Sequence, residues 1–151
     1  MRIRVLTTTL AAGAVLAVPA TAAAPSRFHA KLNGRAESPK TTSKATGKAT
    51  FKIAASGRSI AYTLSAKGLS GKAQAAHIHL GAPGKAGPVM IVISAKPFSL
   101  PRHGTLTAKQ FTKVPGASSF SAALKAIRAG RTYVNIHTAK NPGGEIRGQI
   151  R

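Results

Sequence analysis

The chain of 151 residues carries 23 lysines and arginines against two acids, giving a formal net charge of +21, and it contains no cysteine. The missing cysteine excludes a disulfide framework and thiol chemistry. Only two acids, Glu37 and Glu145, could orient a catalytic base, which argues against a hydrolytic triad. They lie far apart in the sequence and are expected at opposite ends of the domain, which argues against a paired-carboxylate mechanism.

Residues 1–23 have the three-part layout of a secretory signal peptide. Two arginines precede the uncharged run Val5–Val18, and small residues follow it. The run is shorter than the roughly 20 residues that cross a membrane, so we predict cleavage after Ala22 or Ala23 and no transmembrane anchor afterwards. Loss of the two arginines lowers the net charge from +21 to +19. The mature protein is expected to be secreted or extracytoplasmic, in the periplasm or cell envelope.

Residues 24–151 are predicted to form one all-β domain, because short segments of alternating polarity are broken at intervals by glycine and proline. Ser59–Ala66 is the clearest case, since Ile60, Tyr62 and Leu64 recur at every second position. The pattern favours an immunoglobulin-like or Greek-key antiparallel β-sandwich or barrel. The further strands predicted are Ala45–Ala54, Ala73–Leu80, Val89–Ile93, a short one near Gly104–Ala108, Thr132–Thr138 and Glu145–Ile150.

One short helix is predicted near 118–129. Ser118 or Ser119 can cap its start, apolar residues recur at helical spacing within it, and Gly130 can end it. The turn Asn141–Gly144 then predicts a hairpin between the last two strands, because it combines a proline with two glycines.

The five histidines include a His-x-His pair in a predicted strand. Alternation places His77 and His79 on one face, with Cα atoms about 6.6 Å apart. In the strand Thr132–Thr138, His137 also points away from the predicted core. We therefore predict a metal site formed by surface-facing His77, His79 and His137, with His103 or His29 as a fourth ligand. An all-imidazole site suits copper or another transition metal such as zinc.

Two simpler interpretations stay open at this point. The imidazoles could instead bond to loop backbone and orient the glycine-rich turns near Gly81 and Gly143. Glu145 and Arg147, on either side of Ile146, are interpreted as a structural pair that links to a neighbouring strand.

The positive charge is spread along the whole mature chain. Lys48 and Lys52 would share one face of the predicted strand Ala45–Ala54. We expect contact with anionic extracellular polymers or the cell surface, and the alternative is an evenly basic surface without a partner. A dedicated nucleic-acid partner is not expected, since export separates the protein from cellular nucleic acid and aromatic side chains are few.

Two motifs complete the sequence-based picture. His77-Ile78-His79, together with Tyr133–Thr138 followed by Asn141–Gln149, resembles the CHRD (chordin-type) domain over about Phe28 to Arg151. This resemblance implies an immunoglobulin-like β-sandwich or barrel in an extracellular setting, and it implies a fold more directly than an activity.

A more distant likeness is to the Cu/Zn superoxide dismutases, whose histidines at corresponding positions bind copper. The chain departs from that pattern because it has no cysteine for the disulfide and no long loop with further zinc ligands. A dismutase-like redox enzyme is therefore kept as one alternative to an exported binding or structural module. The other alternative is an adhesin-like binder of anionic extracellular polymers that binds no metal and in which the histidines are only structural.

Overall fold

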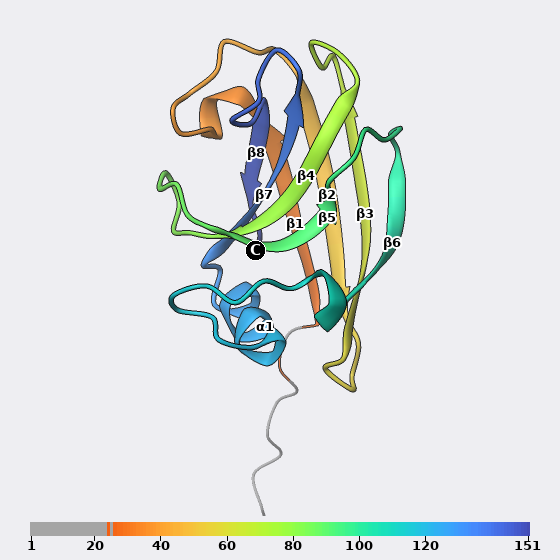
Figure 1. Ribbon diagram of the computed structural model, residues 1–151, viewed down its shortest axis with the longest axis vertical. Helices are drawn as coiled ribbons and strands as arrows, with labels where there is room; N and C mark the ends of the chain where they lie inside the picture. Colours follow the sequence, from red (N-terminus) through yellow and green to blue (C-terminus); the bar gives the residue numbers. More distant parts are fainter. Residues whose placement is uncertain (1–23, 25) are drawn as a thin grey trace, which may run out of the picture.

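The computed structural model describes residues 24 and 26–151, so the predicted signal peptide at 1–23 lies outside the described residues. Eight antiparallel strands form one sheet that curls into a nearly closed barrel, in the order β5-β4-β7-β8-β1-β2-β3-β6 (Figure 1). The strands are β1 (Arg27–Asn33), β2 (Thr46–Ile53), β3 (Ser59–Lys67), β4 (Ala73–Leu80), β5 (Val89–Ser94), β6 (Arg102–Thr107), β7 (Thr132–Thr138) and β8 (Ile146–Gln149). The prediction of an all-β fold is confirmed, and the barrel is the form that it takes.

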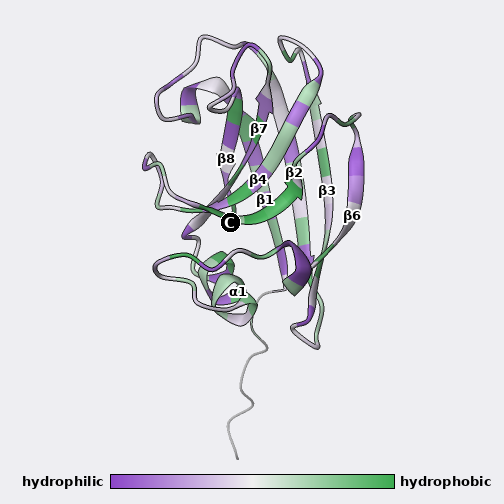
Figure 2. Ribbon diagram, viewed as in Figure 1, coloured by the Kyte–Doolittle hydropathy of each residue, from purple (hydrophilic) through white to green (hydrophobic). Residues whose placement is uncertain are grey.

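The strands follow from the alternation in the sequence. In β3 the side chains of Ile60, Tyr62 and Leu64 are buried, and those between them are exposed. Strand β1 has the same strict alternation but was not predicted separately. Figure 2 shows that β5 is hydrophobic throughout, whereas β6 at the opposite edge of the sheet is largely hydrophilic. The short strand predicted near Gly104–Ala108 begins at Arg102 instead.

The single α-helix, α1 (Phe120–Arg128), lies within the predicted range. Ser119 is its N-cap, and the Ser119 hydroxyl accepts a hydrogen bond from the backbone N–H of Ala122 at 3.1 Å. Gly130 follows the helix at a φ of 65°, the left-handed conformation that commonly ends helices. Two one-turn 3-10 helices complete the structure, η1 (Gly34–Ala36) and η2 (Ala108–Gln110). Among the described residues, no helix is both long and apolar enough to cross a membrane.

Helix α1 lies at one end of the barrel, and the segment after β1 lies at the other end beside the β7–β8 turn (Figure 1). That turn is the predicted hairpin: the N–H of Gly144 bonds to the carbonyl of Asn141 at 3.1 Å, and β7 pairs with β8 antiparallel. Together with the β4–β5 loop, these connections surround the outer face of β4 and β7. The candidate site lies on that face.

Candidate metal centre

The three predicted ligands meet on neighbouring strands. His77 and His79 extend from β4, His137 extends from β7, and the ligand atoms of the three imidazoles lie within 4.8 Å of one another. The pairing explains this convergence, since His77 lies opposite Asn135 and His79 lies opposite Tyr133. In both strands the residues of the other phase, Ile78 on β4 for example, fill the barrel core. Alternation places the histidines on the outer face of their strands, and the pairing of β4 with β7 brings them together, so the predicted grouping of the three is found.

The histidines are less accessible than the sequence suggested. His79 is only 8% exposed, and its neighbours Tyr133 and Asn135 are 3% and 2% exposed. His77 and His137 are half-buried. The prediction of surface-facing ligands is therefore wrong for His79, because connecting loops fold back over the outer face of the sheet here. A ligand at this site would sit in a largely dry environment.

Backbone carbonyls of two loops determine the tautomers of two imidazoles. His79 Nδ1 lies 2.8 Å from the carbonyl oxygen of Gly87, and His137 Nδ1 lies 2.8 Å from that of Pro142. A carbonyl can only accept, so both Nδ1 atoms carry the proton. Each neutral ring is then left with a lone pair on Nε2. The simpler interpretation, that the histidines bond to loop backbone, is therefore correct for His79 and His137.

The two free Nε2 atoms point at the same oxygen. Asn135 Oδ1 lies 3.1 Å from His79 Nε2 and 3.0 Å from His137 Nε2. His77 Nδ1 lies 3.1 Å from His137 Nε2 and can donate to it. The other two contacts place acceptor against acceptor when the imidazoles are neutral. When His77 donates to His137, the Nε2 lone pair of His79 still has no donor, and a cation at the centre of this cluster would satisfy the lone pairs that face Asn135 Oδ1.

Glu37 determines which way the Asn135 amide points. The amide donates to the Glu37 carboxyl, a bond that lowers the pKa of that acid. Its oxygen is therefore turned toward the histidines. Burial dominates for Glu37 and raises its pKa to about 7, against the opposing effects of Arg147, the Ser38 backbone and Asn135. One oxygen of Glu37 has no hydrogen-bond partner.

A stack of side chains supports His79 from the side. The imidazole lies parallel to the Tyr133 ring, with centroids 4.7 Å apart and an interplanar angle of 6°. The Arg147 guanidinium lies 4.2 Å from the centre of the Tyr133 ring. Arg147 also donates to the carbonyls of Ala36 and Lys85, which ties η1 and the β4–β5 loop to β8. The position of His79 is thus determined by contacts on both loops.

Glu145 occupies a separate polar cluster and is 0% exposed. Burial raises its pKa, but hydrogen bonds from Ser70, Thr138 and Ser43 outweigh burial and hold the pKa at about 2. Glu145 and Arg147 contact different partners, so the predicted pair is instead two independent loop anchors. The acids are also not at opposite ends of the domain, since Glu37 lies against Gly144, the residue before Glu145.

Neither of the proposed fourth ligands joins the cluster. His103 is exposed on β6 and pairs with Thr63, and His29 is exposed on β1 and pairs with Thr50. Both strands lie on the other side of β8 from β7 in the sheet order. The expectation that His103 or His29 completes the site is therefore wrong, because it considered residue type without topology.

All three site histidines have lowered pKa values, mainly because burial disfavours the charged ring. The pKa of His77 falls to about 4, with additional repulsion from His137 and His79. Burial also lowers the pKa of His79 and of His137, although hydrogen bonds to Gly87 and Pro142 oppose the shift. The three imidazoles are therefore neutral at pH 7, which is the form that can bind a cation.

The histidine shifts lower the stability of the metal-free protein as the pH falls from 6.5 toward 4, because the unfolded chain then binds protons that the folded chain excludes. The Glu37 shift acts in the opposite direction and largely offsets the His77 shift between pH 7 and pH 5. Denaturant unfolding with a chelator present should therefore show the histidine effect in the Glu37→Gln variant, as a loss on the order of 1 to 2 kcal/mol between pH 7 and pH 5 after solvent screening. Addition of His77→Gln should reduce this loss. A Glu37→Gln variant that becomes more stable on acidification would contradict this account.

Several residues of the site were not predicted from the sequence: Glu37, Tyr133, Asn135 and Arg147. A usable signal was present for two of them. Tyr133 and Asn135 share the phase of His137 in β7, so alternation places them on the same face. Glu37 and Arg147 reach the site through loop and sheet topology, which no local pattern reveals.

Comparison with known families agrees with this structure. The model of the CHRD domain matches residues 28–150, which is nearly all of the chain outside the predicted signal peptide. Comparison with curated proteins and with solved structures gave no match. The matched segment contains all eight strands except the first residue of β1, together with the three histidines. The chain therefore belongs to the CHRD domain family.

Proposed function

We propose that this CHRD domain is an exported module that binds one transition-metal ion, with copper(II) as the expected metal, through His77, His79 and His137. The observation that supports the proposal most strongly is the pair of Nε2 lone pairs on His79 and His137 that face Asn135 Oδ1 without a proton between them. Three imidazoles with no thiolate nearby form a ligand set that copper and zinc accept.

The surroundings match those of known metal-binding histidines. Such ligands commonly donate their second ring N–H to a backbone carbonyl, and His79 and His137 both do so. Bound nitrogens at 2.0–2.1 Å from a tetrahedral metal lie roughly 3.3 Å apart, so the widest separation of 4.8 Å must close on binding. Half-buried His77 has the most freedom to make this movement.

The proposal includes export, and its only support is the signal-peptide pattern of residues 1–23. Outside the cytoplasm the domain would meet metal ions without competition from thiol buffers. A dismutase-type activity is the second function to test, but it has less support here. The three histidines lack the fourth that the likeness would require, and among the described residues this is the one cluster that could hold a metal.

Calorimetric titration of the mature domain with Cu(II) and with Zn(II), after treatment with a chelator, tests the proposal. We expect one equivalent of copper, and a saturating excess of about 100 Kd should stabilise the fold by about 2.7 kcal/mol. Superoxide decay is then measured on the copper-loaded protein. Stoichiometric binding without decay supports a binding module, and decay supports the dismutase alternative. No uptake of either metal would overturn both.

A further inference from the structure

The outer surface of β1, β2 and β3 is a continuous array of polar and basic side chains, which we call the basic face. Alternation directs its members outward while their neighbours fill the core. Its exposed cations are Arg27, Lys31, Lys48, Lys52 and Lys67. The predicted sharing of one face by Lys48 and Lys52 is confirmed. The basic face lies away from the metal centre, on the part of the sheet beyond β8.

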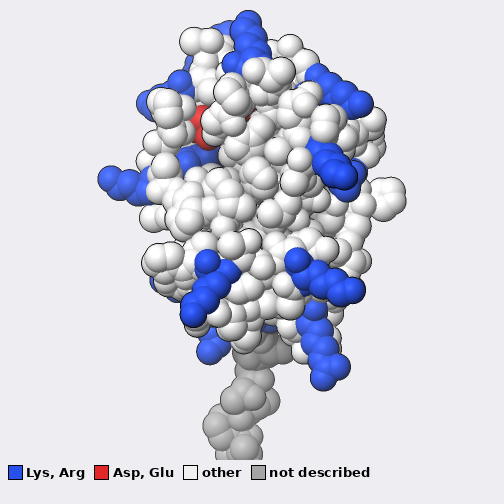
Figure 3. Space-filling model, viewed as in Figure 1, with Lys and Arg blue, Asp and Glu red and all other residues white. Residues whose placement is uncertain are grey.

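No acidic side chain balances these cations. The only two acids of the chain, Glu37 and Glu145, are 6% and 0% exposed and belong to other clusters. Figure 3 shows the same imbalance on the opposite side of the molecule, where lysine and arginine are spread over the surface. Within the described part of the chain, every exposed charged side chain is therefore positive.

The pairing of β1 with β2 concentrates the charge. Lys31 lies directly opposite Lys48, and Arg27 lies directly opposite Lys52. Directly opposed residues of like charge destabilise a sheet, because their Cβ atoms are only about 5 Å apart. A bound anion would remove this repulsion. Repulsion between the opposed cations therefore destabilises the basic face when no anion is bound, and binding of an anionic ligand would relieve it.

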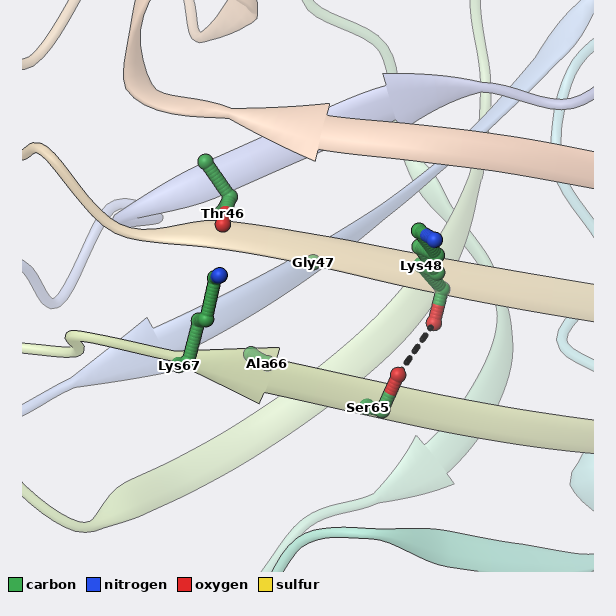
Figure 4. A pocket seen from close by; sticks show the side chains of 6 residues that line it. All are labelled: Thr46, Gly47, Lys48, Ser65, Ala66 and Lys67. Atoms are coloured by element: carbon green, nitrogen blue, oxygen red, sulfur yellow. Dashed lines mark hydrogen bonds between the residues drawn. The ribbon is translucent and has the colours of Figure 1, made fainter.

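Two shallow depressions lie on the basic face. One, of about 370 Å³, lies between β2 and β3 and is lined by Thr46, Lys48, Ser65 and Lys67 among others; Figure 4 shows these side chains on adjacent strands. The second, also about 370 Å³, spans β1 to β3 and includes Lys52 in its lining. Each depression is thus bordered by cations and hydroxyl groups.

The chemistry of the face favours phosphate over bases. Along β1 the cations Arg27 and Lys31, and along β2 the cations Lys48 and Lys52, are four residues and therefore about 13 Å apart, so they form two parallel rows. Lysine ammonium groups and hydroxyls such as those of Thr50 and Thr63, which bond to each other at 2.7 Å, can both contact phosphate oxygens. The aromatic rings of Phe28, Phe51 and Tyr62 point into the core, so the imidazole of His29 is the one exposed aromatic ring on these strands, whereas a run of bases needs several rings to stack on.

We propose that the basic face binds a linear polymer of repeated phosphate groups that lies across β1, β2 and β3. The contacts are to phosphate oxygens rather than to bases or sugars. Free inorganic polyphosphate and a cell-wall poly(glycerol phosphate) offer the same chemistry. This site is independent of the proposed metal function, since no residue is shared between the two.

Binding of the mature domain to long-chain polyphosphate and to poly(glycerol phosphate) is measured at several salt concentrations, with heparin and an oligothymidylate for comparison. The face variant replaces Lys31, Lys48 and Lys52 with glutamine. The matched control replaces Lys113, Lys125 and Lys140, three exposed lysines elsewhere on the surface, in the same way. Both variants lower the net charge equally.

We expect the face variant to bind at least one phosphate polymer ten-fold more weakly and to reduce the slope of log Kd against log salt by about 2. The control should change neither quantity appreciably, and the His77→Gln variant should bind polyphosphate like wild type. If one of the two phosphate polymers binds more tightly than the other, that polymer is identified as the preferred ligand. Equal losses in the face and control variants, or tighter binding of heparin or oligothymidylate than of both phosphate polymers, would overturn the proposal.

Discussion

Replacing Glu145 with alanine should lower the free energy of unfolding by about 4 kcal/mol, the largest effect on stability expected for a single polar residue of this protein. The carboxylate accepts hydrogen bonds from Ser70 N–H at 2.8 Å and from the hydroxyls of Ser70, Thr138 and Ser43 at 2.6 to 2.7 Å. Removing it leaves the buried Thr138 hydroxyl and the more accessible donors of Ser43 and Ser70 without this acceptor, and it detaches two loops from the end of β7. Urea denaturation at pH 7 measures the loss.

The other acid provides the control for Glu145. In Glu37→Gln an amide replaces a carboxyl whose pKa is already raised to about 7, so stability should change by less than about 1 kcal/mol. The two acids also affect the pH dependence of stability in opposite directions. The contribution of Glu145 is complete above pH 4.5 and is lost as the pH falls toward about 2. Equal destabilisation by the two substitutions would contradict the distinct roles assigned to them.

Replacing His79 with alanine should weaken copper binding by at least about 100-fold, since even residues that only support a ligand contribute 10- to 100-fold to affinity. His79 is the most buried of the three proposed ligands, and its position is held by Gly87 and by the Tyr133 ring. Competition titration against a chelator of known affinity measures the change, after circular dichroism has shown that the variant is folded.

The two exposed histidines serve as matched controls. His103→Ala and His29→Ala remove the same side chain from β6 and β1, far from the cluster in the sheet, and should leave copper affinity unchanged. Should the buried position affect folding, His137→Ala tests the same claim from β7 at a half-buried position. An affinity that depends on His103 or His29 as strongly as on His79 would show that copper binds elsewhere.

Local patterns in the sequence were enough for most of the fold. Period-two alternation predicted Ser59–Ala66 and Thr132–Thr138 to within a residue, because each of these strands has one side against the core. The same alternation placed His77, His79 and His137 on the outward side of their strands, but their convergence depends on the pairing of β4 with β7. Strand pairing was not available from the sequence, and this is why His103 and His29 were wrongly considered as ligands.

Burial of the site was the other property that could not be predicted. Alternation places His79 outside the barrel, and only the return of two loops over β4 and β7 makes it buried. That return depends on long-range contacts, such as those from Arg147 on β8 to Ala36 and Lys85. Glu37 enters the site by the same route, 98 positions from Asn135 in the chain but joined to it by a hydrogen bond.

Electron paramagnetic resonance of the domain loaded with one equivalent of Cu(II) tests the central claim most directly, because it counts the nitrogens bound to copper. The geometry predicts hyperfine coupling to three imidazole nitrogens, and to one fewer in each of the His77, His79 and His137 variants. A spectrum without nitrogen coupling, or one that these three substitutions leave unchanged, would contradict the assignment of the metal centre.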